Sequence, residues 1–226
     1  MAGPLGLVIA IDGVIGAGKS TAARGVAQAL HYRHLDTGAM YRAVALCGIR
    51  QGVSADDHQG LANLLSQLRI QLTPLDEGGR ILLNDEDVSD AIRRPEITRV
   101  VGSYADRPDV RQRLIESQRA MGAEGGIVAE GRDMSTVVFP SADLKIRMLA
   151  ELDERARRRH EEFVASGVEI SLEQVRQDIS TRDLEDEQRD YGAQGHPRDV
   201  TDVLTDGLGI DDVIGQIVAL ARQRGA

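Results

Sequence analysis

The sequence predicts an α/β fold in which helices flank a parallel β-sheet, and three observations support this prediction. Residues 7–12 (LVIAID) form a short apolar run closed by Asp-Gly, which is typical of a buried strand. The glycine-rich stretch GVIGAGKST (13–21) follows directly and leads into an amphipathic helix over 21–31. A second strand (32–38) and a second helix (39–50) repeat this order, which indicates parallel strands joined by right-handed crossovers.

The middle of the chain departs from this alternation. Residues 69–74 and 80–84 flank the turn DEGG (76–79), and this pattern predicts an antiparallel hairpin. A hairpin of this kind is foreign to a parallel sheet. We therefore expect residues 63–95 to form an insert that contains a small antiparallel sheet.

The core pattern resumes after the insert. We expect strands at 126–133 (GIVAEGRD), 142–150 (ADLKIRMLA) and 202–207 (DVLTDG), followed by a terminal helix. The inward-facing residues expected on that helix are Val213, Ile214, Ile217, Val218 and Ala221. These elements complete a sheet that begins with the first strand of the chain.

Two charged helices interrupt the core pattern. The first is basic and ends at Gly167, and the second begins after Ser171, with Gln174 in the capping-box position. We expect them to form a helical lid. The predicted parts of the chain are a core P-loop domain (1–62, 96–150 and 198–226), the inserted region (63–95) and the lid region (151–197).

Composition limits the classes of function. The 226 residues carry a formal net charge of −9 without a basic block of the kind that binds nucleic-acid backbones. No apolar run approaches the roughly 18 residues of a membrane span, and LGLVIA leads straight into the glycine-rich stretch, unlike a cleaved signal. The single cysteine, Cys47, excludes an internal disulfide. We expect a cytoplasmic monomer that binds neither nucleic acid nor membrane.

The glycine-rich stretch has the spacing of a phosphate-binding P-loop, Gly13 followed by four residues and Gly18-Lys19-Ser20. Glycines let the backbone turn its N–H groups onto an anion, and the following helix adds its N-terminal dipole. Lys19 can then reach the β- and γ-phosphates, and Ser20 offers a hydroxyl to Mg²⁺. The residues expected at this phosphate site are Gly13, Val14, Ile15, Gly16, Ala17, Gly18, Lys19, Ser20 and Thr21.

A P-loop alone is compatible with a kinase, a GTPase switch or an ATP-driven machine. The chain lacks the Asn-Lys-x-Asp motif with which GTPases read their base, and an ATP-driven motor would normally be longer. Asp76 to Gly79 formally match a D-x-x-G switch motif, but they follow a proline-broken stretch and are better explained as the hairpin turn. A small-molecule kinase remains by elimination.

Arginines are candidates for stabilising charge during phosphoryl transfer, which needs positive charge around the moving group. Arg42 and Arg132 follow core strands, and ligands of open α/β sheets bind beyond the carboxyl ends of strands. Further candidates fall at helical spacings: Arg155, Arg158 and Arg159 on the first lid helix, and Arg182, Asp186 and Arg189 on the second. The basic helix could equally be a solvated surface with Glu–Arg pairs.

Several segments together resemble the bacterial cytidylate kinase family. They are IDG…GAGKST, LDTGAMYRAVAL, EDVSDAIR, AEGRDMSTVVFPSADLKI, ERARRR, RDLEDEQR and TDGLGIDDVI. They occur in order from residue 7 to about residue 218, and EGRD followed by TVVFP is the most specific. The resemblance implies phosphoryl transfer from ATP to CMP or dCMP with Mg²⁺, and implies that the insert binds the nucleoside monophosphate.

The resemblance also implies roles for matching residues. Thr37 and Arg42 would contact the CMP, with Ser103, Arg111 and Asp133 around its cytosine. The remaining contacts to ribose and phosphate would come from Arg132, Arg182, Asp186 and Arg189. Arg155, Arg158 and Arg159 would be lid residues. The residues expected to act in catalysis are Lys19, Arg132, Arg158 and Arg189, with Ser20 at the metal.

The chain departs from the family pattern at four places. Val14-Ile15 stand where the loop usually has a proline after its first glycine, and Ser135 replaces a glycine. The interval from Ser103 to Arg111 is one residue shorter than usual, and YGAQGHPRD follows Arg189 in place of an Ala-Pro-Leu-like segment. None of these changes removes a charged residue that the chemistry needs.

Some alternatives stay open at this point. Asp36, Glu130 or Asp133 could hold a Mg²⁺-bound water, and the sequence does not choose among them. Two other functions remain: a P-loop kinase for a different acceptor, and a nucleotide-binding regulator without turnover. The five histidines show no metal-binding spacing.

Overall fold

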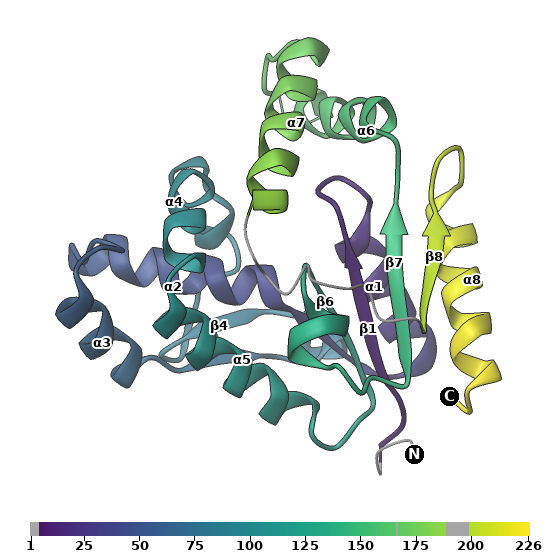
Figure 1. Cartoon of the computed structure of the whole chain (residues 1–226), viewed down its shortest axis with the longest axis horizontal. Coiled ribbons are helices and arrows are strands. Elements are labelled where there is room, and N and C mark those ends of the chain that lie inside the picture. Colours follow the sequence, from purple (N-terminus) through teal and green to yellow (C-terminus); the bar gives the residue numbers. More distant parts are fainter. Residues whose placement is uncertain (1–4, 166, 189–198) are drawn as a thin grey trace. The chain divides into compact units, whose positions relative to one another are not determined.

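The computed structural model describes residues 5–165, 167–188 and 199–226 (Figure 1). The strands are β1 (Val8–Gly13), β2 (Arg33–Asp36), β3 (Ile70–Leu72), β4 (Ile81–Leu83), β5 (Glu86–Asp87), β6 (Ile127–Gly131), β7 (Leu144–Leu149) and β8 (Val200–Leu204). The α-helices are α1 (Lys19–Leu30), α2 (Thr37–Gln51), α3 (His58–Gln67), α4 (Pro95–Ala105), α5 (Pro108–Gly122), α6 (Leu152–Ala165), α7 (Leu172–Gln188) and α8 (Ile210–Gln223). Short helical turns are η1 (Leu75–Glu77), η2 (Ala91–Arg93) and η3 (Met134–Val138), the last being a π-helix.

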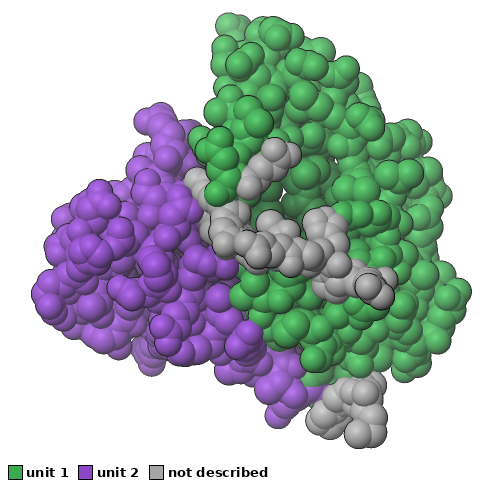
Figure 2. Space-filling view, viewed as in Figure 1, with its two compact units in different colours: residues 1–32, 125–226 green, residues 33–124 purple. Residues whose placement is uncertain are grey.

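The chain divides into two units, residues 1–32 with 125–226 and residues 33–124 (Figure 2). In the first unit, β6, β1, β7 and β8 are neighbours in this order, and each neighbouring pair is parallel. This confirms the predicted parallel sheet. The central strand β1 is apolar and covered on both faces, and its residues Ile9, Ala10 and Ile11 are fully buried.

Parallel register brings the carboxyl ends of three strands to one edge of this sheet. Asp12 of β1 is paired with Gly131 of β6 and with Arg147 of β7. The phosphate loop follows β1 at this edge, and Arg132 follows β6. The sheet therefore places the predicted loop and one predicted arginine at the same end of the first unit, where α/β proteins bind ligands.

Helix α1 carries the loop on its N-terminus and packs on α8 through small residues. Its buried residues are Ala22, Ala23, Val26 and Ala27. A Cβ at Gly25 would lie 2.2 Å from Cδ1 of Ile214, so the side chain of Ile214 packs directly over this glycine. Val213, Ile217, Val218 and Ala221 of α8 are buried, as predicted for this face, whereas Ile214 is half-buried.

Helices α6 and α7 lie side by side as a hairpin (Figure 1). Between them is a small hydrophobic core. Ala156 of α6 and Val175 and Ile179 of α7 are its buried residues. Ser171 caps α7, since its Oγ accepts a hydrogen bond of 3.1 Å from the backbone N–H of Gln174. The two predicted helices are thus confirmed, with their cap.

The second unit holds β2, the helices α2 to α5 and a three-stranded sheet in the order β3-β4-β5. Both strand pairs of this sheet are antiparallel, which confirms the predicted hairpin. Helices α3, α4 and α5 are not among the predicted elements, although Pro95 and Pro108 mark the first turns of α4 and α5. The boundaries 63–95 proposed for the insert stay a prediction.

No α-helix among the described residues is both long and apolar enough to cross a membrane.

A matched pair of glycine substitutions tests the packing of the second unit. In α2, a Cβ at Gly48 would lie 2.4 Å from Oη and 2.6 Å from two ring carbons of Tyr104. Tyr104 is buried and donates a 2.5 Å hydrogen bond to the carbonyl of Val53, so its ring is held in place. We expect Gly48→Ala to lower the free energy of unfolding by about 1–3 kcal/mol.

The control is Gly215→Ala in α8, where nothing lies within 4 Å of the added Cβ. This change should raise the free energy of unfolding by about 0.5–1 kcal/mol, because alanine favours a helix interior over glycine. Urea unfolding followed by circular dichroism measures both. A free energy of unfolding for Gly48→Ala that is equal to or above that of the unmodified chain would contradict the packing described for Gly48.

Candidate active site

Three glycines give the phosphate loop its shape. Gly13, Gly16 and Gly18 have φ values of 153°, 77° and 83°, in the region that side chains disfavour. At Gly13 a Cβ would also lie 2.4 Å from the carbonyl oxygen of Met148 on β7. Gly18 is the N-cap of α1 and has no side-chain cap, so the first N–H groups of this helix face the loop. This is the backbone arrangement that binds phosphate.

Lys19 lies in the first turn of α1 and reaches back over the loop. Its Nζ donates a 2.8 Å hydrogen bond to the carbonyl oxygen of Val14. Burial first, and then the positive charge of Arg132, lower the pKa of Lys19 to about 8, while Glu130 and Asp12 act in the opposite direction. The ammonium group is thus held at the loop, where an added anion would stabilise its charged form.

Ser20 pairs with one of the three carboxylates that the sequence left open. Its Oγ donates a 2.7 Å hydrogen bond to Oε2 of Glu130, which is buried at the end of β6. Asp36 has another role, because its Oδ1 accepts a 2.8 Å hydrogen bond from the N–H of Ala39 and caps α2. A hydroxyl and a carboxylate are ligand types that Mg²⁺ prefers, so the Ser20–Glu130 pair fits this ion.

Asp12 is a residue of the site that sequence reasoning missed. Its buried carboxylate accepts hydrogen bonds from the N–H of Met134 (2.7 Å), the N–H of Ser135 (2.8 Å) and Oγ of Ser135 (2.5 Å). These bonds fix the start of η3, directly after Arg132 and Asp133. The only sequence signal was the position of Asp12 between strand and loop, and the departure at Ser135 supplies one of its partners.

The predicted pair on α7 lies close to Arg132. Arg132 forms an ion pair with Asp186 of α7. Burial lowers the pKa of Arg182, one turn earlier on the same helix, and the charge of Arg132 adds to this effect. Three residues predicted for one substrate, Arg132, Arg182 and Asp186, therefore lie together in the first unit, and they form an electrostatic group with Lys19.

The arginines of α6 divide into two kinds. Arg155 is buried and donates to the carbonyls of Ala150 (2.9 Å) and Ile15 (3.2 Å) and to Asp183 (2.7 Å). Arg158 donates to Glu154 and to both oxygens of Thr205. Arg159 pairs with Glu162 on the surface and covers the ring of Phe163, so it matches the alternative of a solvated helix.

Arg158 was predicted to act in catalysis, and here it is held by its own helix and by the turn after β8. The role in catalysis stays a prediction.

The other predicted substrate residues belong to the second unit, except for Asp133 and Arg189. Thr37 is buried at the start of α2, and Arg42 on the same helix donates to Oγ1 of Thr98 (2.7 Å) and to the carbonyl of Ile92 (3.3 Å). Ser103 is exposed on α4, and Arg111 is half-buried on α5. Asp133 is buried in the first unit, between Arg132 and η3. Arg189 lies outside the described residues.

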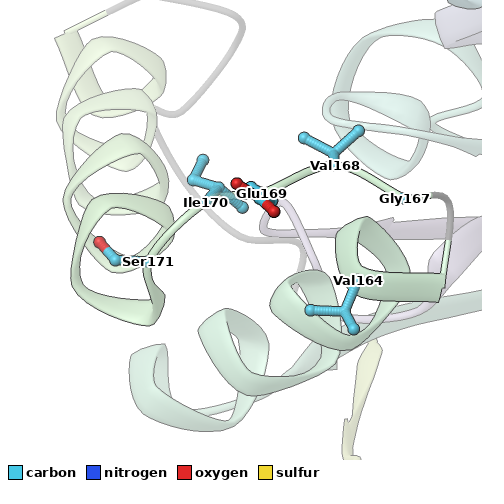
Figure 3. Close-up of a pocket in the computed structure, with 6 residues that line it drawn as sticks. All are labelled: Val164, Gly167, Val168, Glu169, Ile170 and Ser171. Atoms are coloured by element: carbon cyan, nitrogen blue, oxygen red, sulfur yellow. The ribbon is translucent and has the colours of Figure 1, made fainter.

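A shallow pocket lies at the turn between α6 and α7 (Figure 3). Its lining residues are Val164, Gly167, Val168, Glu169, Ile170 and Ser171. None of these is a predicted site residue. The described residues also contain no group of three or more His, Cys, Asp and Glu side chains that could hold a metal ion. A metal at the phosphate loop would therefore need oxygens from a bound phosphate in addition to Ser20 and Glu130.

Comparisons with known proteins agree with the resemblance. The family model described as cytidylate kinase matches residues 9–223. A cytidylate kinase of Carboxydothermus hydrogenoformans is 43% identical over 212 residues, covering 94% of this chain and 96% of that protein. A cytidylate kinase of Geobacter sulfurreducens is 41% identical over 223 residues, covering 99% and 96%.

Other relatives are longer than this chain. A bifunctional pantoate ligase/cytidylate kinase of Nostoc sp. is 47% identical over 221 residues, which cover 96% of this chain but 41% of that protein. Among solved structures, an uncharacterized protein from Eubacterium ventriosum aligns with a TM-score of 0.53 at 11% identity, over 96% of this chain and 98% of that one. This likeness concerns the fold alone.

The lowered pKa of Lys19 can be measured directly. The sequence contains two lysines, Lys19 and Lys145, so selective ¹³C labelling of lysine gives two Cε signals, and Lys145→Arg assigns them. We expect the Lys19 signal to titrate with a midpoint near pH 8, because burial and Arg132 disfavour the ammonium form.

Arg132→Gln should raise this midpoint, since it removes a positive charge that opposes protonation. Inorganic tripolyphosphate should raise it as well, by favouring the charged form. A midpoint at the ordinary lysine value near 10.4 in the free protein would contradict the described environment of Lys19.

Proposed function

This chain belongs to the cytidylate kinase family, and on that premise we propose that it transfers the γ-phosphoryl group of ATP to CMP or dCMP, giving ADP and CDP or dCDP. The observation that carries this proposal is the phosphate loop with Lys19 folded over it and Ser20 paired with Glu130. The charge of Arg132, which acts on both Lys19 and Arg182, supports transfer between two phosphorylated molecules.

The loop would bind the phosphates of ATP through the backbone N–H groups of residues 13–21. Lys19 would shift from the carbonyl of Val14 to the β- and γ-phosphates. Ser20 would hold Mg²⁺ directly and Glu130 through a bound water. When bound, this ion neutralises charge on the phosphate oxygens and helps to align them for transfer.

The residues proposed to bind the acceptor are assigned by the family resemblance. We propose Arg42 and Arg132 for its phosphate and Ser103, Arg111 and Asp133 for the cytosine. The further proposed contacts are Thr37, Arg182, Asp186 and Arg189. We also propose that the chain acts in the cytoplasm as a monomer and takes neither nucleic acid nor membrane as partner.

The transfer needs little proton chemistry. An oxygen of the CMP phosphate attacks the γ-phosphorus in line, a new P–O bond forms, and the bond from that phosphorus to the β,γ-bridging oxygen breaks, so ADP leaves. The second pKa of such a phosphate is about 6, and the attacking oxygen is already ionised at neutral pH. Lys19 and the arginines stabilise the charge that spreads over the transferred group.

The proposal is tested by coupled ADP release with ATP, Mg²⁺ and each of CMP, dCMP, UMP, AMP and GMP in turn. We expect turnover with CMP and dCMP, and a loss of about 10²–10³-fold or more in kcat for Lys19→Ala. Turnover confined to another monophosphate would favour a kinase with a different acceptor. Binding of ATP without turnover for any acceptor would favour the regulator.

Glu130→Gln tests the proposed metal contact. The Mg²⁺ concentration for half-maximal activity should rise about 10–100-fold, since an outer carboxylate that orients a metal-bound water contributes about this much. The KM for CMP should change less than about twofold. Glu151→Gln, at an exposed position beside the same sheet, is the control. An unchanged Mg²⁺ dependence in Glu130→Gln would exclude the proposed contact.

A further inference from the structure

The tip of the phosphate loop is part of the hydrophobic core of the α6–α7 hairpin. Ile15 packs against the cluster of Ala156, Val175 and Ile179, which otherwise consists of residues from the two helices and their connection. Phosphate binding by this loop uses backbone N–H groups and needs no side chain at position 15. The apolar side chain of Ile15 is therefore directed to the hairpin.

Arg155 makes a second, polar connection at the same place. From α6 it donates to the carbonyl oxygen of Ile15 at 3.2 Å and to Oδ2 of Asp183 on α7 at 2.7 Å. It is only 6% exposed. A Cβ at Gly16 would lie 3.1 Å from Cβ of Arg155, so loop and helix are in close contact here. The backbone of the loop and α7 thus share one buried guanidinium group.

The face of α7 that makes these contacts also carries predicted substrate residues. Val175, Ile179, Arg182 and Asp186 follow one another at spacings of four, three and four residues, which places them along one side of a helix. Asp186 is ion-paired with Arg132. Helix α7 therefore contacts the phosphate loop through Val175 and Ile179, and it contacts Arg132 through Asp186.

We propose that Ile15 and Arg155 are positioning residues that couple occupation of the phosphate loop to the placement of Arg182 and Asp186 on α7. This inference rests on the proposed function, in which the loop binds ATP and α7 contacts the acceptor. Phosphates that draw the loop N–H groups inward change the position of Ile15 and its carbonyl. Because packed cores deform little, α7 follows, and the affinity for the acceptor rises.

The first test measures α7 without any acceptor. Amide hydrogen exchange is followed with and without a non-hydrolysable ATP analogue and Mg²⁺. In the unmodified chain the analogue should slow exchange in α7 by about 5–150-fold, the range of coupling between sites in proteins. In Ile15→Ala this protection should fall below about twofold, although the analogue still binds.

Two further variants separate coupling from general damage. Ile15→Leu keeps an apolar side chain of similar volume and should retain the protection of α7. Leu184→Ala changes an exposed residue of α7 and should also retain it. Thermal unfolding of each variant establishes that it is folded. Full protection of α7 in Ile15→Ala, or none in the unmodified chain, would overturn the inference.

The second test measures the affinity for CMP by calorimetry, with and without the same analogue. In the unmodified chain the analogue should strengthen CMP binding by a factor within the same range of about 5–150. In Ile15→Ala this factor should approach one, while CMP binding without the analogue stays within twofold. Equal weakening with and without the analogue would indicate a purely structural role and overturn the inference.

The two proposals fail in different ways. A chain that shows protection of α7 by the analogue but does not bind CMP would contradict the proposed acceptor and leave the link from the loop to α7 supported. A chain that phosphorylates CMP with unchanged coupling in Ile15→Ala would contradict the inference alone.

Discussion

The carboxylate of Asp12 is the constraint on which the candidate site depends. It ends the buried part of β1, and the phosphate loop begins at the next residue. A buried carboxylate is costly unless it is hydrogen-bonded, and this one obtains its partners from Met134 and Ser135. The loop after β1 is thereby tied to the segment after β6, in which Arg132 and Asp133 immediately precede those partners. One interaction thus fixes two parts of the site that are distant in sequence.

The parallel sheet makes this interaction possible. Since Asp12 is in register with Gly131, the chain after each strand emerges at the same edge, and Glu130 lies close enough to bond Ser20. Helices α6 and α7 then add a second layer of contacts, in which Ile15 joins their core and Asp186 pairs with Arg132. The phosphate loop consequently has contacts with the sheet at its base and with the α6–α7 hairpin at its tip.

Local sequence patterns predicted the structural elements that are determined by interactions between residues close in sequence. The strand, the glycine loop and α1, the antiparallel hairpin and the cap at Ser171 follow from short-range rules of burial, turn and capping. The pairing of Ser20 with Glu130, 110 residues apart, and the partners of Asp12 depend on sheet register, which no local pattern encodes. The arginines of α6 show the same limit, because one charged stripe contains the buried Arg155 and the exposed Arg159.

The positive charges of the site explain why it should bind polyanions. They do not explain which base it selects. Lys19 and Arg182 both have lowered pKa values, and in each case burial acts first and the charge of Arg132 second. Such a group of cations is destabilised by its own proximity, and phosphate relieves that repulsion whichever nucleoside carries it. Discrimination among monophosphates must therefore come from hydrogen bonds to the base, since a buried polar group left unpaired by the wrong base is costly. Among the proposed residues, the buried Asp133 is suited to this role, because its carbonyl oxygen accepts hydrogen bonds from the N–H groups of Val137 and Val138 in η3, which fix its backbone.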